Sequence, residues 1–292
     1  MPFLTLPIAP ERSDADFLSQ VTPVLLTYNE RPNLGRSLAR LAWAREVVVV
    51  DSGSDDGTQE IANQYPNVRL VHRRFDTHAN QWNFATAETG IATPWILALD
   101  ADYMLTPQLV EELAALSPDP RQDGYRTRFR YCVFGRPLRG TLYPPVITLF
   151  RAGKGCYVQD GHTQRLKLTN PFGTLRGFID HDDRKPLSRW MWAQDRYAAL
   201  EAELLKSKPP SELRLQDKLR KLVVVAPWLV PLYCLTVGRG LLDGRAGIFY
   251  ALQRGVAETI LALKLLESHL RSRGAEGQVE AHRNSEKHED AA

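Results

Sequence analysis

Two carboxylates, Asp100 and Asp102, end a segment that otherwise has the composition of a buried strand, LALDADYML at residues 97–105. Charged groups inside a protein are costly unless they are paired or bind a metal. Carboxylates one residue apart suit Mg²⁺ or Mn²⁺, because one can coordinate the ion while the other contacts the ion or a bound ligand. The alternative is that both only cap the turn before the next helix.

Strands and helices alternate four times over the first 116 residues. Apolar runs predict strands at 22–30, 46–51, 67–71 and 94–100. The second holds four consecutive valines, which is typical of a strand buried on both faces. Apolar spacing and cap residues predict helices at 32–43, 55–65, 78–91 and 106–116. The alternation predicts an open, mostly parallel α/β sheet with helices on both faces.

Four acidic residues fall just after these strands: Glu30, Asp51, Asp100 and Asp102. Ligands of open α/β sheets bind at the carboxyl ends of the strands. A divalent cation held there would neutralise the charge that builds on a leaving diphosphate. The agreement of several positions predicts a site for a cation and a diphosphate.

The second half of the chain changes character. Segments 125–134, 144–151 and 174–181 are strand candidates, and 187–205 is a long helix. Residues 206–221 carry six Lys or Arg against two acids, whereas 222–237 are uncharged and 248–266 are helical and largely apolar. We expect an N-terminal extension at 1–20, an α/β domain at 21–205, a helical appendage at 206–272 and a disordered tail at 273–292.

Three segments carry a resemblance to a known family. LTYNE (26–30), VVDSGSDDGT (49–58) and LALDADY (97–103) resemble, in order and spacing, the motifs of family 2 glycosyltransferases with the GT-A fold. The resemblance covers roughly residues 20–205. Residues 43–62 and QWNFA (81–85) are similar to bacterial enzymes that add a sugar during lipopolysaccharide-core assembly.

The resemblance implies a role for each matched position. Thr27, Glu30 and Asp51 would line the nucleotide pocket, with Asp100 near the ribose and the metal and Asp102 on the metal, Mg²⁺ or Mn²⁺. Gln81 and Asn83 would lie along the sugar-nucleotide cleft. Ser52 stands where the family usually has a second Asp that often contacts the base, so the choice of base stays open.

An inverting transferase, as the resemblance implies, needs a general base for the acceptor hydroxyl. Our first choice is Asp160 and our second His162, in VQDGHTQRL (158–166); His162 could instead join the metal shell. The DHDD segment at 180–183 is a third candidate. The alternative for these segments is a solvated polar turn.

Polymerising members of the family carry a QxxRW segment. Here Pro186 stands where the Gln would precede Arg189 and Trp190, which indicates transfer of a single sugar. Trp190 and Trp192 either contact the acceptor or pack in the core.

The basic and apolar residues 206–266 predict attachment to a membrane surface. The uncharged run of 16 residues is shorter than the about 20 that span a bilayer, and Pro227 and Pro231 interrupt it. Basic groups are attracted to anionic cytoplasmic leaflets, so we expect helices lying in the inner leaflet, beside a lipid-linked or glycan acceptor. The alternative is a helical hairpin packed on the domain or forming a dimer contact.

Composition limits the other function classes. The net charge of +3 does not argue for nucleic acid. The three cysteines have no metal-ligand spacing and suit a reducing compartment, and the first residues lack a signal-peptide pattern, so we expect the cytoplasm.

A sugar nucleotidyltransferase would show a glycine-rich basic loop near LLTYNERPNL (25–34), which has none. A non-catalytic membrane adaptor on a transferase fold remains the other alternative.

Overall fold

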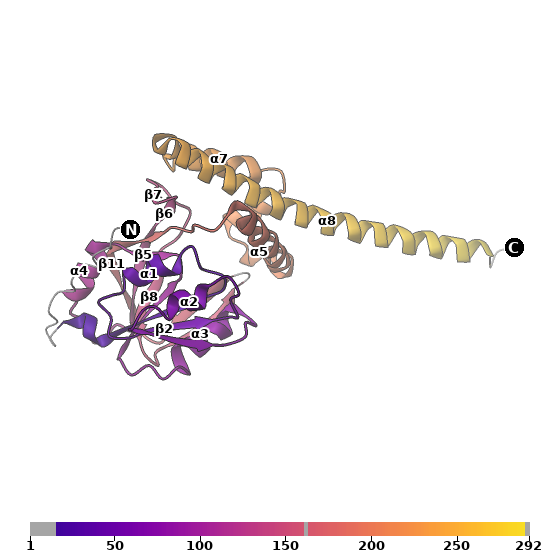
Figure 1. The fold of residues 1–292 in the computed structure, drawn as a ribbon. Helices are drawn as coiled ribbons and strands as arrows, with labels where there is room; N and C mark the ends of the chain where they lie inside the picture. The colour runs from indigo at the N-terminus through magenta and orange to yellow at the C-terminus, as the bar shows by residue number, and fades with distance from the viewer. Residues whose placement is uncertain (1–15, 161–162, 290–292) are drawn as a thin grey trace. The chain divides into compact units, whose positions relative to one another are not determined.

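The computed structural model describes residues 16–160 and 163–289 of the 292-residue chain. The chain forms two compact units, Met1–Pro186 and Leu187–Ala292, and each is considered by itself. The first unit contains the sheet and the second contains helices (Figure 1).

The first four strands form the parallel half of the sheet. They are β1 (Val21–Thr27), β2 (Val47–Asp51), β3 (Val68–His72) and β4 (Trp95–Asp100). Their order is β3-β2-β1-β4, and every neighbouring pair is parallel. All five residues of β2 are buried, as the valine run predicts. The predicted α/β architecture is confirmed.

The sheet continues beyond β4 with strands of mixed direction. These are β5 (Tyr103–Leu105), β6 (Gly124–Val133), β7 (Arg136–Pro137), β8 (Val146–Arg151) and β11 (Phe172–His181). The order continues β4-β8-β6-β11-β5, and β7 pairs with β6. β6 and β11 are parallel, whereas β8 runs antiparallel to β4 and to β6. β9 (Gly155–Asp160) and β10 (Thr163–Leu168) form a separate two-stranded sheet.

Both faces of the parallel strands are buried. Alternate residues such as Leu25 and Val49 join one core, and Val24 and Val48 join the other, as side chains that alternate along strands must. The first core also contains residues of η1 (Phe17–Gln20), α1 (Leu34–Ala39), α2 (Thr58–Ala62) and α4 (Pro107–Ala114). The second contains residues of α3 (His78–Ala87) and Tyr157 of β9.

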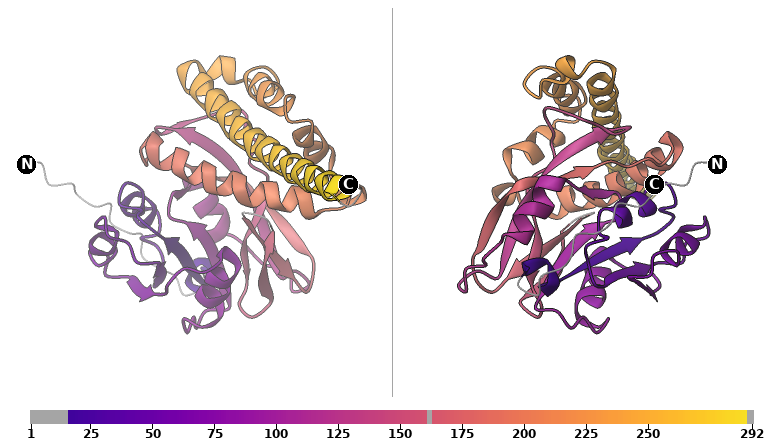
Figure 2. Two further views of the ribbon diagram at one scale, coloured as in Figure 1. Left: turned by 90° about the vertical axis from the view of Figure 1, so that its right-hand side faces the viewer. Right: turned by 60° about the vertical axis from the view of Figure 1, so that its left-hand side comes forward.

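The second unit is helical. It contains α5 (Leu187–Ser207), η2 (Pro210–Glu212), α6 (Leu215–Lys221), α7 (Ala226–Leu235), η3 (Gly240–Asp243) and α8 (Arg245–Glu289). α5 and α8 lie side by side, joined by a small core that includes Ala202 and Leu261 (Figure 2). Throughout the described ranges, every helix is too short or too polar to cross a bilayer.

Two features of this unit differ from the expected division of the chain. α5, which we placed in the α/β domain, belongs to the helical unit. Residues 273–289, for which we expected disorder, continue α8. This stretch contains four Glu and two Arg, residue types that favour helix. The polar composition of this stretch alone did not predict that the helix continues.

Candidate active site

The carboxyl ends of β1, β2 and β4 meet at one edge of the sheet. Thr27 lies beside Asp51, and Leu26 beside Asp100, in the registers of the parallel pairs. The hydroxyl of Thr27 donates a hydrogen bond of 2.8 Å to Asp51 Oδ2. Asp51 and Asp100, which were predicted from strand ends, therefore lie on the two strands that flank β1, and Thr27, which the resemblance implied, lies between them.

Asp51 organises the loop that follows β2. Its Oδ1 accepts hydrogen bonds from the backbone N–H groups of Gly53 and Ser54 at 3.0 and 2.8 Å and from Gln59 Nε2 at 2.9 Å. Its Oδ2 accepts from the hydroxyls of Thr27 and Ser54. Burial raises the pKa of Asp51, but these hydrogen bonds outweigh it and the pKa is lowered. The anionic carboxylate thus fixes the loop that presents Ser52.

Ser52 and Gln81 are brought together, and Arg73 joins them. Gln81 is fully buried, and its Nε2 donates to Ser52 Oγ at 3.1 Å while its Oε1 accepts from Arg73. Sequence reasoning missed Arg73; its position directly after β3, next to the other strand ends, was the available signal.

Asn83 makes a different contact. Its side chain donates to the backbone O of Tyr157 at 2.9 Å and accepts from the N–H of Tyr157 at 2.8 Å. It therefore joins α3 to β9, and its predicted place along the sugar-nucleotide cleft stays a prediction.

Asp102 is paired with a histidine from the other end of the domain. His181 ends β11, and its Nε2 lies 3.1 Å from Asp102 Oδ2. The imidazole stands among the rings of Tyr103, Tyr131 and Tyr143, with centroids 4.9 to 5.2 Å away. His181 Nδ1 is buried and has no hydrogen-bond partner among residues 16–160 and 163–289. This pairing orients the carboxylate of Asp102.

The two carboxylates of the DAD segment differ in their proton affinity. Burial, followed by the charge of Asp102, raises the pKa of Asp100. Burial also acts to raise the pKa of Asp102, but the charge of His181 and its hydrogen bond lower it. Asp102 therefore keeps its negative charge more readily than Asp100 does. The negative charge of Asp100 has less favourable interaction with nearby positive groups.

A buried ion pair completes the site. Lys185 Nζ lies 2.5 Å from Glu30 Oε1 and 3.9 Å from Asp183 Oδ2. Asn33 Nδ2 donates to both carboxylates, at 2.8 Å to each. Burial raises the pKa of Glu30 to about 7, against the lowering effect of Lys185 and with a further rise from Asp102. Glu30 is thus held near the DAD segment by Lys185, which sequence reasoning missed.

Every residue of the third base candidate, DHDD at 180–183, contacts another side chain. Asp180 pairs with Arg130 at 2.7 Å, and His181 meets Asp102. Asp182 binds Arg36 and Arg184, and Asp183 accepts from Asn33. The segment is therefore not a solvated turn: it fastens the end of β11 to the start of α1.

The first base candidate, Asp160, lies at the end of β9. It is opposite Thr163 in the antiparallel register. His162 lies outside the described residues. The roles of Asp160 and His162 stay predictions.

The residues around Asp100 and Asp102 fit a divalent cation. In the part of the chain that the structure describes, no cluster of three or more His, Cys, Asp or Glu side chains forms a ready metal site. Mg²⁺, however, is usually held by one or two carboxylates together with substrate phosphates and water. The like charges of Asp100 and Asp102 would be relieved by such an ion.

Comparison with known proteins identifies the class. The model of glycosyl transferase family 2 matches residues 23–182, more than half of the chain, so the chain belongs to this family. The protein is a nucleotide-sugar-dependent glycosyltransferase with the GT-A type of α/β sheet. This confirms the family, fold and enzyme class that the motifs predicted.

Several relatives illustrate this membership. LpsC of Rhizobium meliloti (strain 1021), a lipopolysaccharide core biosynthesis glycosyltransferase, is 27% identical over 190 residues, which cover 61% of this chain and 69% of LpsC. An uncharacterized glycosyltransferase of Rickettsia felis is 29% identical over 109 residues, 37% of this chain and 38% of the relative. Among solved structures, S. aureus TarS in complex with UDP-GlcNAc aligns over 86% of this chain and 91% of its own, with 15% identity and a TM-score of 0.45.

Proposed function

We propose that this enzyme transfers a single sugar, with inversion, from a nucleotide-diphosphate sugar to a membrane-linked glycan or lipid acceptor in cell-envelope or lipopolysaccharide biosynthesis. The binding of the donor is supported by the position of Asp51 and Asp100 at the ends of β2 and β4, with Asp102 directly after β4. Lys185 lies close enough to Asp100 and Asp102 for its charge to interact with both. Homology to LpsC, whose name refers to lipopolysaccharide core biosynthesis, supports the acceptor class.

Asp102, together with Asp100, would hold Mg²⁺ or Mn²⁺ in this proposal. The ion supplies charge stabilisation for the departing diphosphate. His181 fixes the orientation of Asp102 through their 3.1 Å contact, an outer partner of the kind that metal-ligating groups usually have. Lys185 offers a buried ammonium close to the same carboxylates.

Thr27, Glu30, Ser52, Gln81 and Asn83 remain the proposed nucleotide-sugar contacts. The loop held by Asp51 presents Ser52, and buried Gln81 supports Ser52 from α3. Asp160, or else His162, would take the proton of the acceptor hydroxyl. A base on the β9–β10 hairpin would come from the second half of the domain, which is where an acceptor is expected to face the donor.

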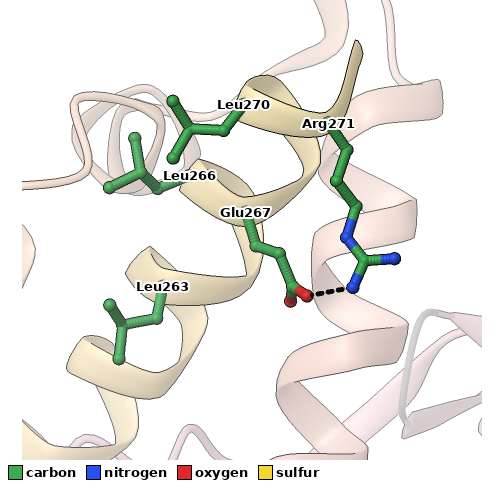
Figure 3. A pocket seen from close by; sticks show the side chains of 5 residues that line it. All are labelled: Leu263, Leu266, Glu267, Leu270 and Arg271. Carbon is green, nitrogen blue, oxygen red and sulfur yellow. Dashed lines mark hydrogen bonds and ion pairs between the residues drawn. The ribbon is translucent and has the colours of Figure 1, made fainter. Parts of the chain in front are cut away.

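Attachment to the cytoplasmic face of the membrane is proposed for residues 206–266. Several large apolar side chains of this segment are exposed, among them Trp228 at 79% and Leu242 at 66%. On α8, Leu263, Leu266 and Leu270 line an open hollow of about 540 Å³ beside the ion pair of Glu267 and Arg271 (Figure 3). Apolar side chains that no other part of the structure covers suit the interfacial region of a bilayer.

Thermal shift with a panel of nucleoside diphosphates, with and without Mn²⁺, tests whether the protein binds a nucleotide-diphosphate donor. A ligand that binds the folded state raises the melting temperature by mass action. We expect one nucleotide to give a shift that Mn²⁺ enlarges. Asp102→Asn should abolish the Mn²⁺-dependent part, and His181→Gln should raise the Mn²⁺ concentration needed about 10- to 100-fold.

Asp119→Asn is the matched control, because Asp119 precedes β6 at the opposite edge of the sheet. It should leave both shifts unchanged. If no nucleotide shifts the melting temperature of the wild type, the non-catalytic adaptor becomes the better interpretation. A full Mn²⁺ response in Asp102→Asn would refute the metal assignment alone.

A further inference from the structure

A row of arginines lies on the outer face of β6 and β11. Arg126, Arg128 and Arg130 alternate with the buried residues of β6, so their side chains share one face. On β11 their partners in the register are Thr174, Phe178 and Asp180. Arg176, in the irregular stretch of β11 between Thr174 and Phe178, is also exposed. We call these four arginines the arginine face.

Two guanidinium groups of the face, those of Arg126 and Arg128, are held by aromatic and neutral partners. Arg126 lies 5.8 Å from the ring of Phe172, and its Nε donates to Thr174 Oγ1 at 2.9 Å. Arg128 lies 4.6 Å from the ring of Phe178 and donates to the carbonyl O of Arg176. These contacts orient each cation without neutralising it, which leaves the charge available to a ligand.

The face carries more positive charge than its own carboxylates balance. Asp180 is engaged by Arg130 at 2.7 and 2.9 Å. Glu112 is engaged by the backbone N–H groups of Arg176 and Gly177 at 2.7 to 2.9 Å. Within the described residues, Arg126, Arg128 and Arg176 have no carboxylate partner. Arginines two residues apart on a strand repel one another, so the arrangement suits an anionic partner.

The shape of the face favours an extended anionic surface. Arg126 and Arg130 are about 13 Å apart at the usual rise of a strand. A hollow of about 610 Å³ opens at one end, where Arg130, Arg176 and Phe178 meet Gln108 of α4. At the other end Phe172 is 46% exposed. Cations spread along an open face beside an exposed aromatic ring match the headgroup region of a bilayer better than a single enclosed phosphate.

We propose that the arginine face binds the phosphate groups of anionic lipid headgroups. Guanidinium groups recognise phosphate oxygens through paired hydrogen bonds. The inference rests on the proposed membrane-linked acceptor and adds a second contact, on the catalytic unit itself. Asp180 ends the face, and the next residue, His181, points to the opposite side of β11 and contacts Asp102. A bilayer on this face would therefore lie beside the strand end that holds the active site.

Vesicle co-sedimentation of the full chain tests the inference. The lipids are phosphatidylcholine alone, and phosphatidylcholine with 30% phosphatidylglycerol as the probe. Basic residues at an anionic surface contribute roughly a factor of five each, so Arg126→Gln, Arg128→Gln and Arg176→Gln together should lower the partition coefficient on anionic vesicles about 100-fold. The loss should shrink at high salt, which screens exposed charges.

The control variant removes the same charge elsewhere on the catalytic unit. Arg40→Gln, Arg74→Gln and Lys154→Gln change three exposed cations outside the face. This variant should keep most of the binding, and the nucleotide thermal shift should report that both variants are folded.

The outcomes separate this inference from the proposed function. If the wild type does not bind anionic vesicles, the proposed membrane attachment itself is contradicted. A wild type that binds while the arginine-face variant binds equally well, or loses no more than the control, overturns the arginine face alone. Titration with inorganic phosphate tests whether the ligand is free phosphate and not a lipid headgroup. If the wild type binds free phosphate, the arginine-face variant does not, and both bind vesicles equally, the lipid assignment is overturned.

Discussion

At the scale of single residues, the site depends on contacts between distant parts of the sequence. Asp102 is oriented by His181, and Glu30 by Lys185. Each pair joins a residue near the end of β1 or β4 to the segment 181–185. The carboxylates supply the chemistry, and this late segment supplies the basic side chains that pair with them.

Asp182, in this segment, stabilises the fold through its ion pairs, and the pH dependence of stability can test this contribution. Its side chain is 5% exposed, binds Arg36 and Arg184, and accepts from the N–H of Gly135 at 2.9 Å. Burial raises the pKa of Asp182, but Arg184 and its other partners outweigh this and lower it below 3.8. Both arginines are about one-third exposed, so we expect Asp182→Asn to cost only about 1–2 kcal/mol at pH 7.

The sign of the pH dependence follows from the lowered pKa. The contribution of the carboxylate is complete above its unfolded value of about 3.8 and is lost as pH falls through the lower folded value. Chemical denaturation should therefore show wild type and Asp182→Asn converging below pH 3.8. A constant difference down to pH 2 would mean that shape, not charge, is responsible. Glu111→Gln, which changes an exposed carboxylate of α4, is the control and should alter stability by less than about 0.5 kcal/mol.

The residues that sequence patterns predicted were those fixed by a single strand end. Asp51 and Asp100 follow apolar runs, so their place at the sheet edge needed only the parallel α/β arrangement. Arg73 follows a predicted strand and could have been found by the same rule. Lys185 and Asn33 were not predicted, because their contacts depend on how the end of β11 returns to that edge. Such long-range pairing leaves no periodic signal in the residues themselves.

At the scale of elements, local patterns predicted the parallel strands and their helices but not the order of the mixed strands. The alternation in 125–134 indicated a half-exposed strand, and β6 has that character. Its parallel pairing with β11, and the return of β5 to the edge beside β11, follow from tertiary packing. The side chains exposed on β6 were arginines, which alternation alone could only describe as polar.

The packing of α4 on β11 depends on the lack of a side chain at Gly177. A Cβ there would lie 2.7 Å from Leu109 Cα and 3.0 Å from Leu109 N. Backbone atoms of a buried helix cannot move aside cheaply, so we expect Gly177→Ala to destabilise the fold by about 1–3 kcal/mol. Urea denaturation measures the change.

Gly35→Ala is the matched control for Gly177→Ala. A Cβ at Gly35 would have Ile61 Cγ2 and Tyr65 Oη at ordinary distances of 3.5 and 3.6 Å. Because Gly35 lies within α1, the alanine should be neutral or stabilise the protein by up to about 1 kcal/mol. Equal losses in the two variants would show that the close approach of α4 to β11 does not limit the residue at 177.

At the scale of the whole molecule, the family match and the first unit almost coincide. Residues 23–182 match the family, and the first unit ends at Pro186. The helical unit therefore lies outside the matched region, and its function must be argued from its own surface. Sequence composition predicted a basic and apolar appendage, but it did not indicate that α5 belongs to that unit, because amphipathic helices look alike in either domain.

The exposed apolar side chains of the helical unit can be tested separately from the arginine face. Trp228→Gln and Leu242→Gln replace residues that are 79% and 66% exposed, so stability should change by less than about 0.5 kcal/mol. If these side chains enter the bilayer, each loss should lower vesicle partition roughly tenfold. Unlike the arginine contribution, this loss should persist at high salt, because the transfer of apolar area is not screened.

Phe75→Gln is the control for this pair, since Phe75 is an exposed ring, 40% accessible, on the catalytic unit. It should partition as the wild type does. The same apolar surface could instead be a dimer interface. Sedimentation without lipid distinguishes a dimer interface from membrane contact, because it measures the oligomeric state alone. If Trp228→Gln and Leu242→Gln convert a dimer to a monomer and leave vesicle binding unchanged, the apolar surface is an interface between two copies of the chain. A monomeric wild type whose vesicle binding falls only in this variant would support membrane contact by the helical unit.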